Sequence, residues 1–312
     1  MNPEYSDDFE DKPLPLKLYS EYDDEEDLPI KKRLEALVNG DMSPSQAAID
    51  FDTTITEVTN RRQKEMMKRP DPQALTPEER AQGVNMYDLV PNPRLAIHTI
   101  FLSIARLCSA FPPYHPGQNQ IVEFLEALRA LPRHEVYTGC PSEDPNEPYP
   151  TVLLWPLEGN WEAVAELFDY EITSCYPPYR WRNYNSAMAR LTCSGLVDCG
   201  FLSSLDDILL SSDEYPDLQK RPIDGPNKIG NFMLGAAQWI MWSDECHYVY
   251  QQCKKVESVS GLRQMWSMER WREWKHQFAF VAGDERFVQK YREVAERSHR
   301  QMLICESEDT AE

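Results

Sequence analysis

The chain has 312 residues, of which 41% are hydrophobic, and it carries a formal net charge of -20 at pH 7. This length is enough to bury a substantial core, and the hydrophobic content fits a folded body with polar tails and loops better than a disordered chain. A strongly negative protein repels the phosphates of nucleic acids and of anionic membranes, so we expect neither as a partner.

The N-terminal segment 1–28 is dominated by Asp and Glu and contains an unbroken acidic run at 23–27. A segment with few apolar residues and high charge cannot bury enough surface to fold, so the pattern predicts a disordered acidic tail. The tail lacks the basic start and apolar core of a signal peptide, and no later run reaches the roughly 18 apolar residues that span a bilayer. We therefore expect a soluble protein of the cytoplasm, with the nucleus as an alternative.

Helical patterns begin near Pro29. A first short helix ends at Asn39-Gly40, and Ser43-Pro44 supplies the N-cap and the first residue of the next helix, which continues to about residue 68. Apolar residues then recur at helical spacing over 93–111 and again from residue 117 to 131, and a proline follows each stretch.

The segment 133–156 interrupts these helices. It contains five prolines and has little periodicity, which predicts a long excursion without helix. Long ordered loops are often functional, so this segment is a candidate surface for a partner.

Helical patterning resumes at residue 161 and continues to about residue 305, and neither an alternating strand pattern nor a fixed-period repeat accompanies it. The sequence therefore predicts an all-α protein, an irregular array or bundle of about ten antiparallel helices. We expect a single domain over 29–305 and a disordered C-terminal tail at 306–312.

Catalytic and cofactor signatures are missing from the sequence. The 12 glycines form neither a G-x-G-x-x-G nor a G-x-x-x-x-G-K loop, and no G-x-S-x-G or H-E-x-x-H motif occurs. Asp206-Asp207 lacks the third carboxylate at helical spacing that a metal-binding acidic helix would need. The eight cysteines contain no C-x-x-C pair, which favours buried free thiols. We expect no catalytic residues, no metal and no cofactor.

The segment 266–280 holds three of the eight tryptophans. Trp271, Trp274 and Phe278 recur at helical spacing and form one apolar stripe, which is typical of a helix packed against a core. The alternative is that Arg270 and Lys275, which flank Trp271 and Trp274, stack on the indole rings as part of a binding site.

A second polar and aromatic group lies in the helix predicted over 180–196. A guanidinium held near a core must find a carboxylate, a carbonyl or an anionic ligand, so Arg190 indicates either an internal bond that fixes helix packing or a ligand site. The ligand hypothesis places a small apolar metabolite in a pocket of tryptophans, oriented by polar side chains. Its candidate residues are Trp181, Asn185, Arg190, Trp239, Arg270, Trp271 and Trp274.

Four segments resemble an uncharacterised family of fungal proteins that is catalogued as a domain of unknown function. They are Gly40–Ala48, Trp181–Leu191, Ala236–Ile240 and Met268–Lys275, and their signatures are a Trp-x-Asn-x-Asn helix and a Glu-Arg-Trp-x-x-Trp-Lys element. The resemblance covers about residues 30 to 300. It implies a soluble, helical, intracellular fungal protein and offers no catalytic residue to transfer.

Two functions follow as hypotheses. The first is an interaction or scaffold protein without catalytic activity, which holds a protein partner in a groove between helices or on the proline-rich segment. The second is a small-molecule-binding accessory protein or cryptic enzyme of a fungal secondary-metabolite pathway.

Overall fold

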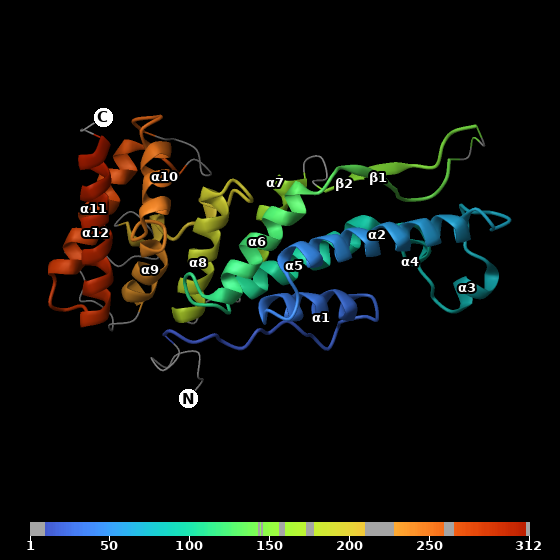
Figure 1. The fold of residues 1–312 in the computed structure, drawn as a ribbon, viewed down its shortest axis with the longest axis horizontal. Coiled ribbons are helices and arrows are strands. Elements are labelled where there is room, and N and C mark those ends of the chain that lie inside the picture. Colours follow the sequence, from blue (N-terminus) through green and yellow to red (C-terminus); the bar gives the residue numbers. More distant parts are fainter. Residues whose placement is uncertain are drawn as a thin grey trace. The chain divides into compact units, whose positions relative to one another are not determined.

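The computed structural model describes residues 10–142, 144, 146–155, 160–172, 178–209, 228–258 and 265–309. The described chain is predominantly α-helical, and its only strands form one short hairpin, so the predicted all-α class is confirmed (Figure 1). Two compact units share the chain, and each unit is assembled from separate stretches of sequence. Unit 1 comprises Met1–Leu16, Ala105–Gln118 and Phe168–Glu312, and unit 2 comprises Lys17–Ile104 and Asn119–Leu167.

Unit 2 is built around a long helix that begins where the sequence predicts. The Ser43 side chain accepts a hydrogen bond from the Gln46 amide, and Pro44 occupies the first turn, so donor groups at the helix start are satisfied or absent. The buried face of this helix includes Phe51 and Ile55, in line with its helical spacing. The helices that lie wholly or partly in this unit are α1 (Asp27–Val38), α2 (Pro44–Met66), α3 (Pro77–Ala81), α4 (Met86–Leu89), α5 (Pro93–Cys108), α6 (Pro116–Ala130) and α7 (Asn160–Ile172).

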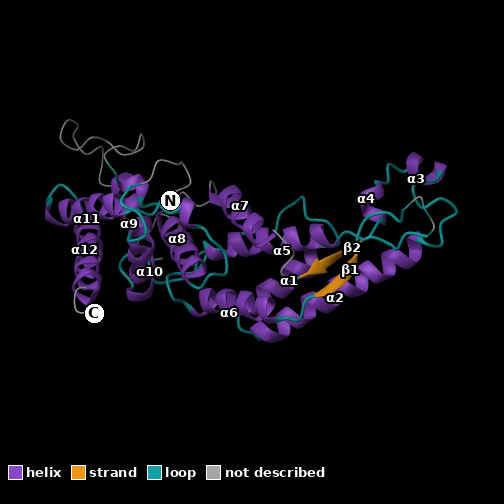
Figure 2. Ribbon diagram, turned by 90° about the horizontal axis from the view of Figure 1, so that it is seen from above, coloured by secondary structure: helices purple, strands orange, loops and turns teal. Residues whose placement is uncertain are grey.

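The proline-rich segment contains a hairpin that the sequence does not predict. Strand β1 (His134–Tyr137) pairs antiparallel with β2 (Thr151–Leu154), and His134 lies opposite Leu154. Each strand has only four residues, which is too short for an alternating pattern to emerge. The pair lies along α2 (Figure 2), where His134 Nε2 is 3.1 Å from Thr56 Oγ1. The segment thus contains two strands where the sequence predicts only an excursion without helix.

Unit 1 is organised around α8 (Pro178–Cys193), which is buried over almost its whole circumference. A helix that is covered on all sides lies at the centre of a core, and its closest helical neighbour is α9 (Lys228–Ala237). Helices α11 (Met268–Gly283) and α12 (Gln289–Asp309) pack closely against one another. The remaining elements are the 3-10 helices η4 (Gly200–Leu202) and η5 (Asp206–Ile208) and the helix α10 (Ser243–Cys253).

The chain ends carry contacts that composition does not reveal. Leu14 and Leu18 are buried, and the Leu14 amide donates to the carbonyl oxygen of Ala110 at 2.7 Å. These two leucines act as apolar anchors in a segment whose acidic composition predicts a disordered tail. Helix α12 likewise runs to Asp309, past the end predicted at residue 305. Residues 1–9 and 310–312 lie outside the described part, and the single domain over 29–305 stays a prediction.

The contact between α8 and α9 gives a first test. A Cβ atom on Gly235 would lie 2.4 Å from Trp181 Nε1 and 2.4 Å from Ser204 Oγ, so Gly235→Ala forces two well-packed side chains apart. We expect this overpacking to lower the free energy of unfolding by about 1–3 kcal/mol, measured by urea denaturation. Gly283→Ala is the matched control, because a Cβ there meets nothing within 4 Å. Equal stability of both variants would contradict the close packing of α8 on α9.

Candidate functional site

The predicted tryptophan cluster lies in unit 1, and the structure brings only part of it together. Trp239 and Trp274 are fully buried and both contact the ring of Trp266, at centroid separations of 6.0 and 6.2 Å. Trp271 is also fully buried, but its ring packs against Tyr250 at 4.8 Å. The central ring of this group, Trp266, was not among the candidate residues, although it opens the same sequence segment.

Asn185 joins three elements of unit 1 through internal hydrogen bonds. Its side-chain oxygen accepts from the Ser204 amide at 3.2 Å, from the Ser204 hydroxyl at 2.8 Å and from Trp239 Nε1 at 3.0 Å. Its amide nitrogen donates to the carbonyl oxygen of Trp181 at 3.1 Å. A buried amide is costly to leave unpaired, so these four bonds explain why a polar side chain is tolerated at full burial.

The C-terminal tryptophans also find acceptors within the fold. Trp271 Nε1 donates to Glu306 at 2.8 Å, and Trp274 Nε1 donates to Asp206 at 3.2 Å. Arg270 lies 3.8 Å from the second oxygen of Asp206 and 3.1 Å from Glu273. Burial raises the pKa of Asp206, and the charge of Arg270 and the indole bond oppose that rise. These contacts favour the packing interpretation of the stripe.

Arg190 belongs to a different cluster of unit 1. Its Nη1 donates to Gln118 at 2.8 Å, and its guanidinium lies 4.4 Å from the centroid of the Tyr114 ring. The Tyr114 hydroxyl donates to Glu245 Oε1 at 2.7 Å, and the Tyr114 backbone adopts a left-handed φ of 59°. The predicted need of the guanidinium for a partner is thus met by an amide oxygen and a ring. Ligand binding by the seven candidate residues stays a prediction. The internal contacts of six of them favour a role in packing, whereas Trp181 Nε1 is buried with no hydrogen-bond partner among the described residues.

Glu245 is the most unusual ionisable group of this cluster. Only 2% of the residue is exposed, and its Oε2 has no hydrogen-bond partner among the described residues. Burial raises the pKa of Glu245, while the hydrogen bond from Tyr114 acts in the opposite direction. The carboxyl therefore holds its proton to higher pH than an exposed glutamic acid does.

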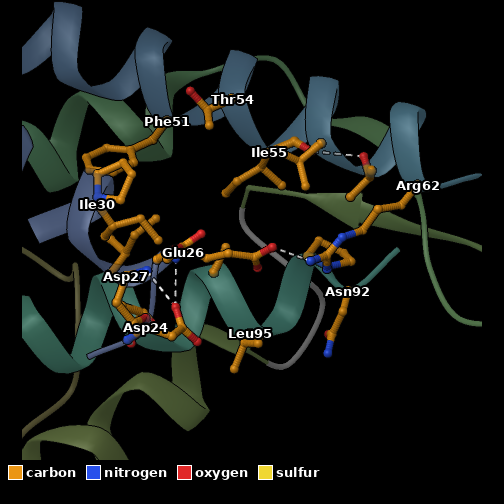
Figure 3. A pocket seen from close by; sticks show the side chains of 18 of the residues that line it. Asp24, Glu26, Asp27, Ile30, Phe51, Thr54, Ile55, Arg62, Asn92 and Leu95 are labelled. Atoms are coloured by element: carbon orange, nitrogen blue, oxygen red, sulfur yellow. Dashed lines mark hydrogen bonds and ion pairs between the residues drawn. The ribbon is translucent and has the colours of Figure 1, made fainter. Parts of the chain in front are cut away.

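A partly open groove lies in unit 2, where sequence analysis placed no site. Helices α1 and α2 and the first turns of α5 enclose a hollow of about 240 Å³ (Figure 3), which we call the α1–α2–α5 groove. Phe51 and Ile55 reach it from α2, and Ile30 reaches it from α1. Its apolar walls are formed by Ile30, Phe51, Ile55, Val58, Leu95 and Ile100.

Charged residues surround this apolar hollow. Four consecutive carboxylates at the start of α1, Asp24 to Asp27, form one edge, which we call the acidic lip. Glu26 pairs with Arg62 of α2 (Figure 3). Asp27 Oδ1 accepts from the Thr99 hydroxyl of α5 at 3.0 Å. Arg33 and Arg61 also line the groove. The walls can therefore exclude water from an apolar group while the edge remains polar.

Two features of the sequence point to this groove, and the sequence analysis used neither of them. Leu95 belongs to a predicted helix but stands outside its apolar stripe, and it is 46% exposed. The acidic run directly precedes the first predicted helix, where carboxylates favour a helix start, yet composition alone assigned it to a tail. A groove made by three helices also depends on how they pack, which periodicity does not reveal.

Other site classes have no support in the described part of the chain. No three or more His, Cys, Asp or Glu side chains gather there in a way that would hold a metal ion. The described cysteines are free. Burial is as predicted for Cys108, Cys199, Cys246, Cys253 and Cys305, whereas Cys140 and Cys193 are only half-buried, and Cys175 lies outside the described residues. No helix among the described residues is both long and apolar enough to cross a membrane.

These features define a mostly helical protein with a partly open groove lined by three helices. The chain belongs to the family described as "Protein of unknown function (DUF3632)", whose model matches residues 98–278, more than half of the sequence. Most of the groove precedes the matched region. No curated protein and no solved structure matches the chain. The predicted resemblance to an uncharacterised family is confirmed, and the predicted fungal origin stays a prediction.

The Asn185 bonds predict a loss of stability on truncation. Asn185→Ala leaves the buried donors of Ser204 and Trp239 without their acceptor, so we expect the free energy of unfolding to fall by about 2–3 kcal/mol. Trp239→Phe removes one of these donors, and the double variant should therefore lose less than the sum of the two single losses. Additive losses in urea denaturation would show that the two residues do not interact.

Glu245 predicts a pH dependence of stability. Because its pKa in the folded state is raised above the ordinary 4.5, the native state binds more protons than the unfolded state. The contribution of Glu245 is fully present below pH 4.5 and is lost as pH rises through the folded-state pKa. Glu245→Gln should flatten this decline in urea midpoints measured from pH 4 to 9, whereas Glu285→Gln, at an exposed position, should leave it unchanged. Identical pH profiles for wild type and Glu245→Gln would contradict the assignment.

Proposed function

We propose that this protein is a helical interaction protein without catalytic activity, and that it holds a segment of a protein partner in the α1–α2–α5 groove. The observation that carries the proposal is the apolar hollow of about 240 Å³ between three helices, bordered by charge. The proposal retains the cytoplasmic location expected from the sequence.

The size of the hollow supports the insertion of a side chain over the docking of a flat surface. Burying one large aliphatic or aromatic side chain contributes about 1.5–3 kcal/mol, and a few such anchors supply most of the affinity of many interfaces. The walls are held in place by the fold, since Phe51, Ile55 and Ile100 are buried. A preformed pocket of this kind binds without a large ordering cost.

The polar groups of the groove support binding over catalysis. Glu26 pairs with Arg62, Asp27 accepts from Thr99, and Asp24 Oδ1 accepts from the backbone amides of residues 26 and 27. These side chains secure the start of α1 to its neighbours. A catalytic site instead needs an acid, base or nucleophile directed at one reacting position.

A small apolar metabolite is the second candidate occupant, because a hollow of about 240 Å³ is also large enough for a small molecule. In that case the protein is a small-molecule-binding accessory protein or cryptic enzyme of a fungal secondary-metabolite pathway, with its ligand in the groove or among the tryptophans. The two candidates differ in the occupant, so identification of the bound species separates them.

Site-directed photocrosslinking tests the first candidate. A benzoylphenylalanine at position 95, on the groove, should crosslink a discrete protein partner in cells of the source organism. The same amino acid at position 303 should not, although Leu95 and Leu303 are both helical and both 46% exposed. The crosslinked species are read by mass spectrometry.

The matched substitutions Leu95→Glu and Leu303→Glu complete the test. Leu95→Glu places a charge on the groove wall and should weaken the affinity for the crosslinked partner at least tenfold, equivalent to about 1.4 kcal/mol. Leu303→Glu places a charge on α12 and should leave this affinity unchanged. Equal crosslinking at both positions, or a partner that binds Leu95→Glu as tightly as wild type, would contradict a binding role for the groove. Recovery of a metabolite in place of a protein would favour the second candidate.

A further inference from the structure

We infer that the partner segment carries a lysine or arginine beside its apolar anchor, and that the acidic lip of the groove receives this cation. The inference rests on the proposed function, because it specifies the chemistry of the segment that the groove holds. Its basis is the distribution of paired and unpaired charge around the apolar walls.

Two carboxylates of the lip have no cationic partner among the described residues. Asp24 and Glu25 are exposed and form no ion pair among the described residues. Glu26 and the neighbouring Asp23 are paired, with Arg62 and Lys31. Asp24 is partly satisfied by backbone amides through one oxygen, and those bonds leave its charge in place. An incoming cation therefore finds two carboxylates available at one edge.

The arginines of the groove do not pair with these two carboxylates. Arg62 is already paired with Glu26. The guanidinium of Arg33 lies 5.8 Å from the centroid of the Phe51 ring, and its Nη1 is buried with no hydrogen-bond partner among the described residues. Arg61 is exposed on α2. Because the carboxylates are consecutive in sequence, they concentrate at the start of α1, whereas the arginines are distributed along α1 and α2. The net charge of -20 adds a long-range attraction for cations.

The geometry of α1 sets the spacing between cation and anchor. Asp27 and Ile30 are three residues apart on one helix, so their side chains lie on the same face about 5–6 Å apart. Ile30 is a wall of the hollow, and Asp27 belongs to the lip. The two carboxylates without an ion pair, Asp24 and Glu25, precede Asp27 by three and two residues. A cation that contacts them while an apolar side chain fills the hollow must therefore lie within about two helical turns of that anchor.

The expected role of the cation is selectivity. An exposed ion pair contributes up to about 1 kcal/mol, and it weakens as salt screens the charges. The apolar anchor therefore supplies most of the affinity, and the lip discriminates against acidic segments and accelerates association with basic ones. A free amine would make the same ion pair with the lip, but it lacks the further anchor residues that a peptide segment supplies.

Peptide selection on the full chain tests the inference. A random 12-residue library displayed on phage is panned against the wild-type protein, and enriched peptides are counter-selected against Leu95→Glu. We expect the groove-dependent peptides to carry a large apolar residue with Lys or Arg within about two helical turns of it. Thr54→Trp, which fills the hollow from α2, serves as a second groove variant in case Leu95→Glu alters the fold.

Synthetic versions of the enriched peptides then measure the contribution of the lip. Glu25→Lys should weaken their binding about five- to tenfold in fluorescence anisotropy at low salt, and the difference should shrink at 0.5 M NaCl. Glu57→Lys is the matched control, because Glu57 is an exposed carboxylate of α2 outside the groove lining. Affinities that are equal for wild type and Glu25→Lys would overturn the inference.

The outcomes separate the inference from the proposed function. Groove-dependent peptides with neutral or acidic flanks would overturn the inference and leave the binding role of the groove in place. Enrichment that survives both Leu95→Glu and Thr54→Trp, or no enrichment at all, would overturn both. Binding of simple alkylamines with the affinity of the peptides would also overturn the inference, because it would assign the site to a small cation.

Discussion

The groove depends on two contacts that fix the start of α1. The ion pair between Glu26 and Arg62 links this start to α2, and the hydrogen bond from Thr99 to Asp27 links it to α5. Both contacts involve carboxylates of the acidic lip, so the residues that form this edge of the groove also hold its apolar walls in place. Without these links α1 would rest only on its apolar face, and the position of Ile30 over the hollow would be less well defined.

Unit 1 is organised by a different constraint, the satisfaction of polar groups inside an aromatic core. Asn185 receives three donors from Ser204 and Trp239, and the indole nitrogens of Trp271 and Trp274 find carboxylates. Each such bond offsets the cost of burying a polar atom and specifies one arrangement of neighbouring elements. The residues that the ligand hypothesis named thus make internal contacts in unit 1 that favour the packing interpretation, whereas the partly open groove lies in unit 2.

Sequence patterns predict those parts of the structure that depend on residues close together along the chain. The Ser43-Pro44 cap, the prolines that follow helices and the spacing of Trp271 and Trp274 correctly place helices and their buried faces. Asn185 illustrates the limit, because its partners are 19 and 54 residues away along the chain and no periodicity connects them. The hairpin was missed because four-residue strands carry too little pattern, and the groove was missed because it arises from three helices that pack together.

The acidic run makes contacts that composition does not reveal. Its charge density predicts disorder, but Asp23 and Glu26 are paired and Asp24 caps the backbone at the start of α1. A few specific contacts are enough to order a segment whose average properties disfavour folding.

The most direct test of the account is methyl NMR of the full chain with a groove-selected peptide. The account predicts that the methyl signals of Ile30, Ile55, Leu95 and Ile100 shift on titration, and that those of Leu303 and Ile304 on α12 do not. Shifts confined to unit 1, or spread without preference over both units, would contradict a binding site between α1, α2 and α5.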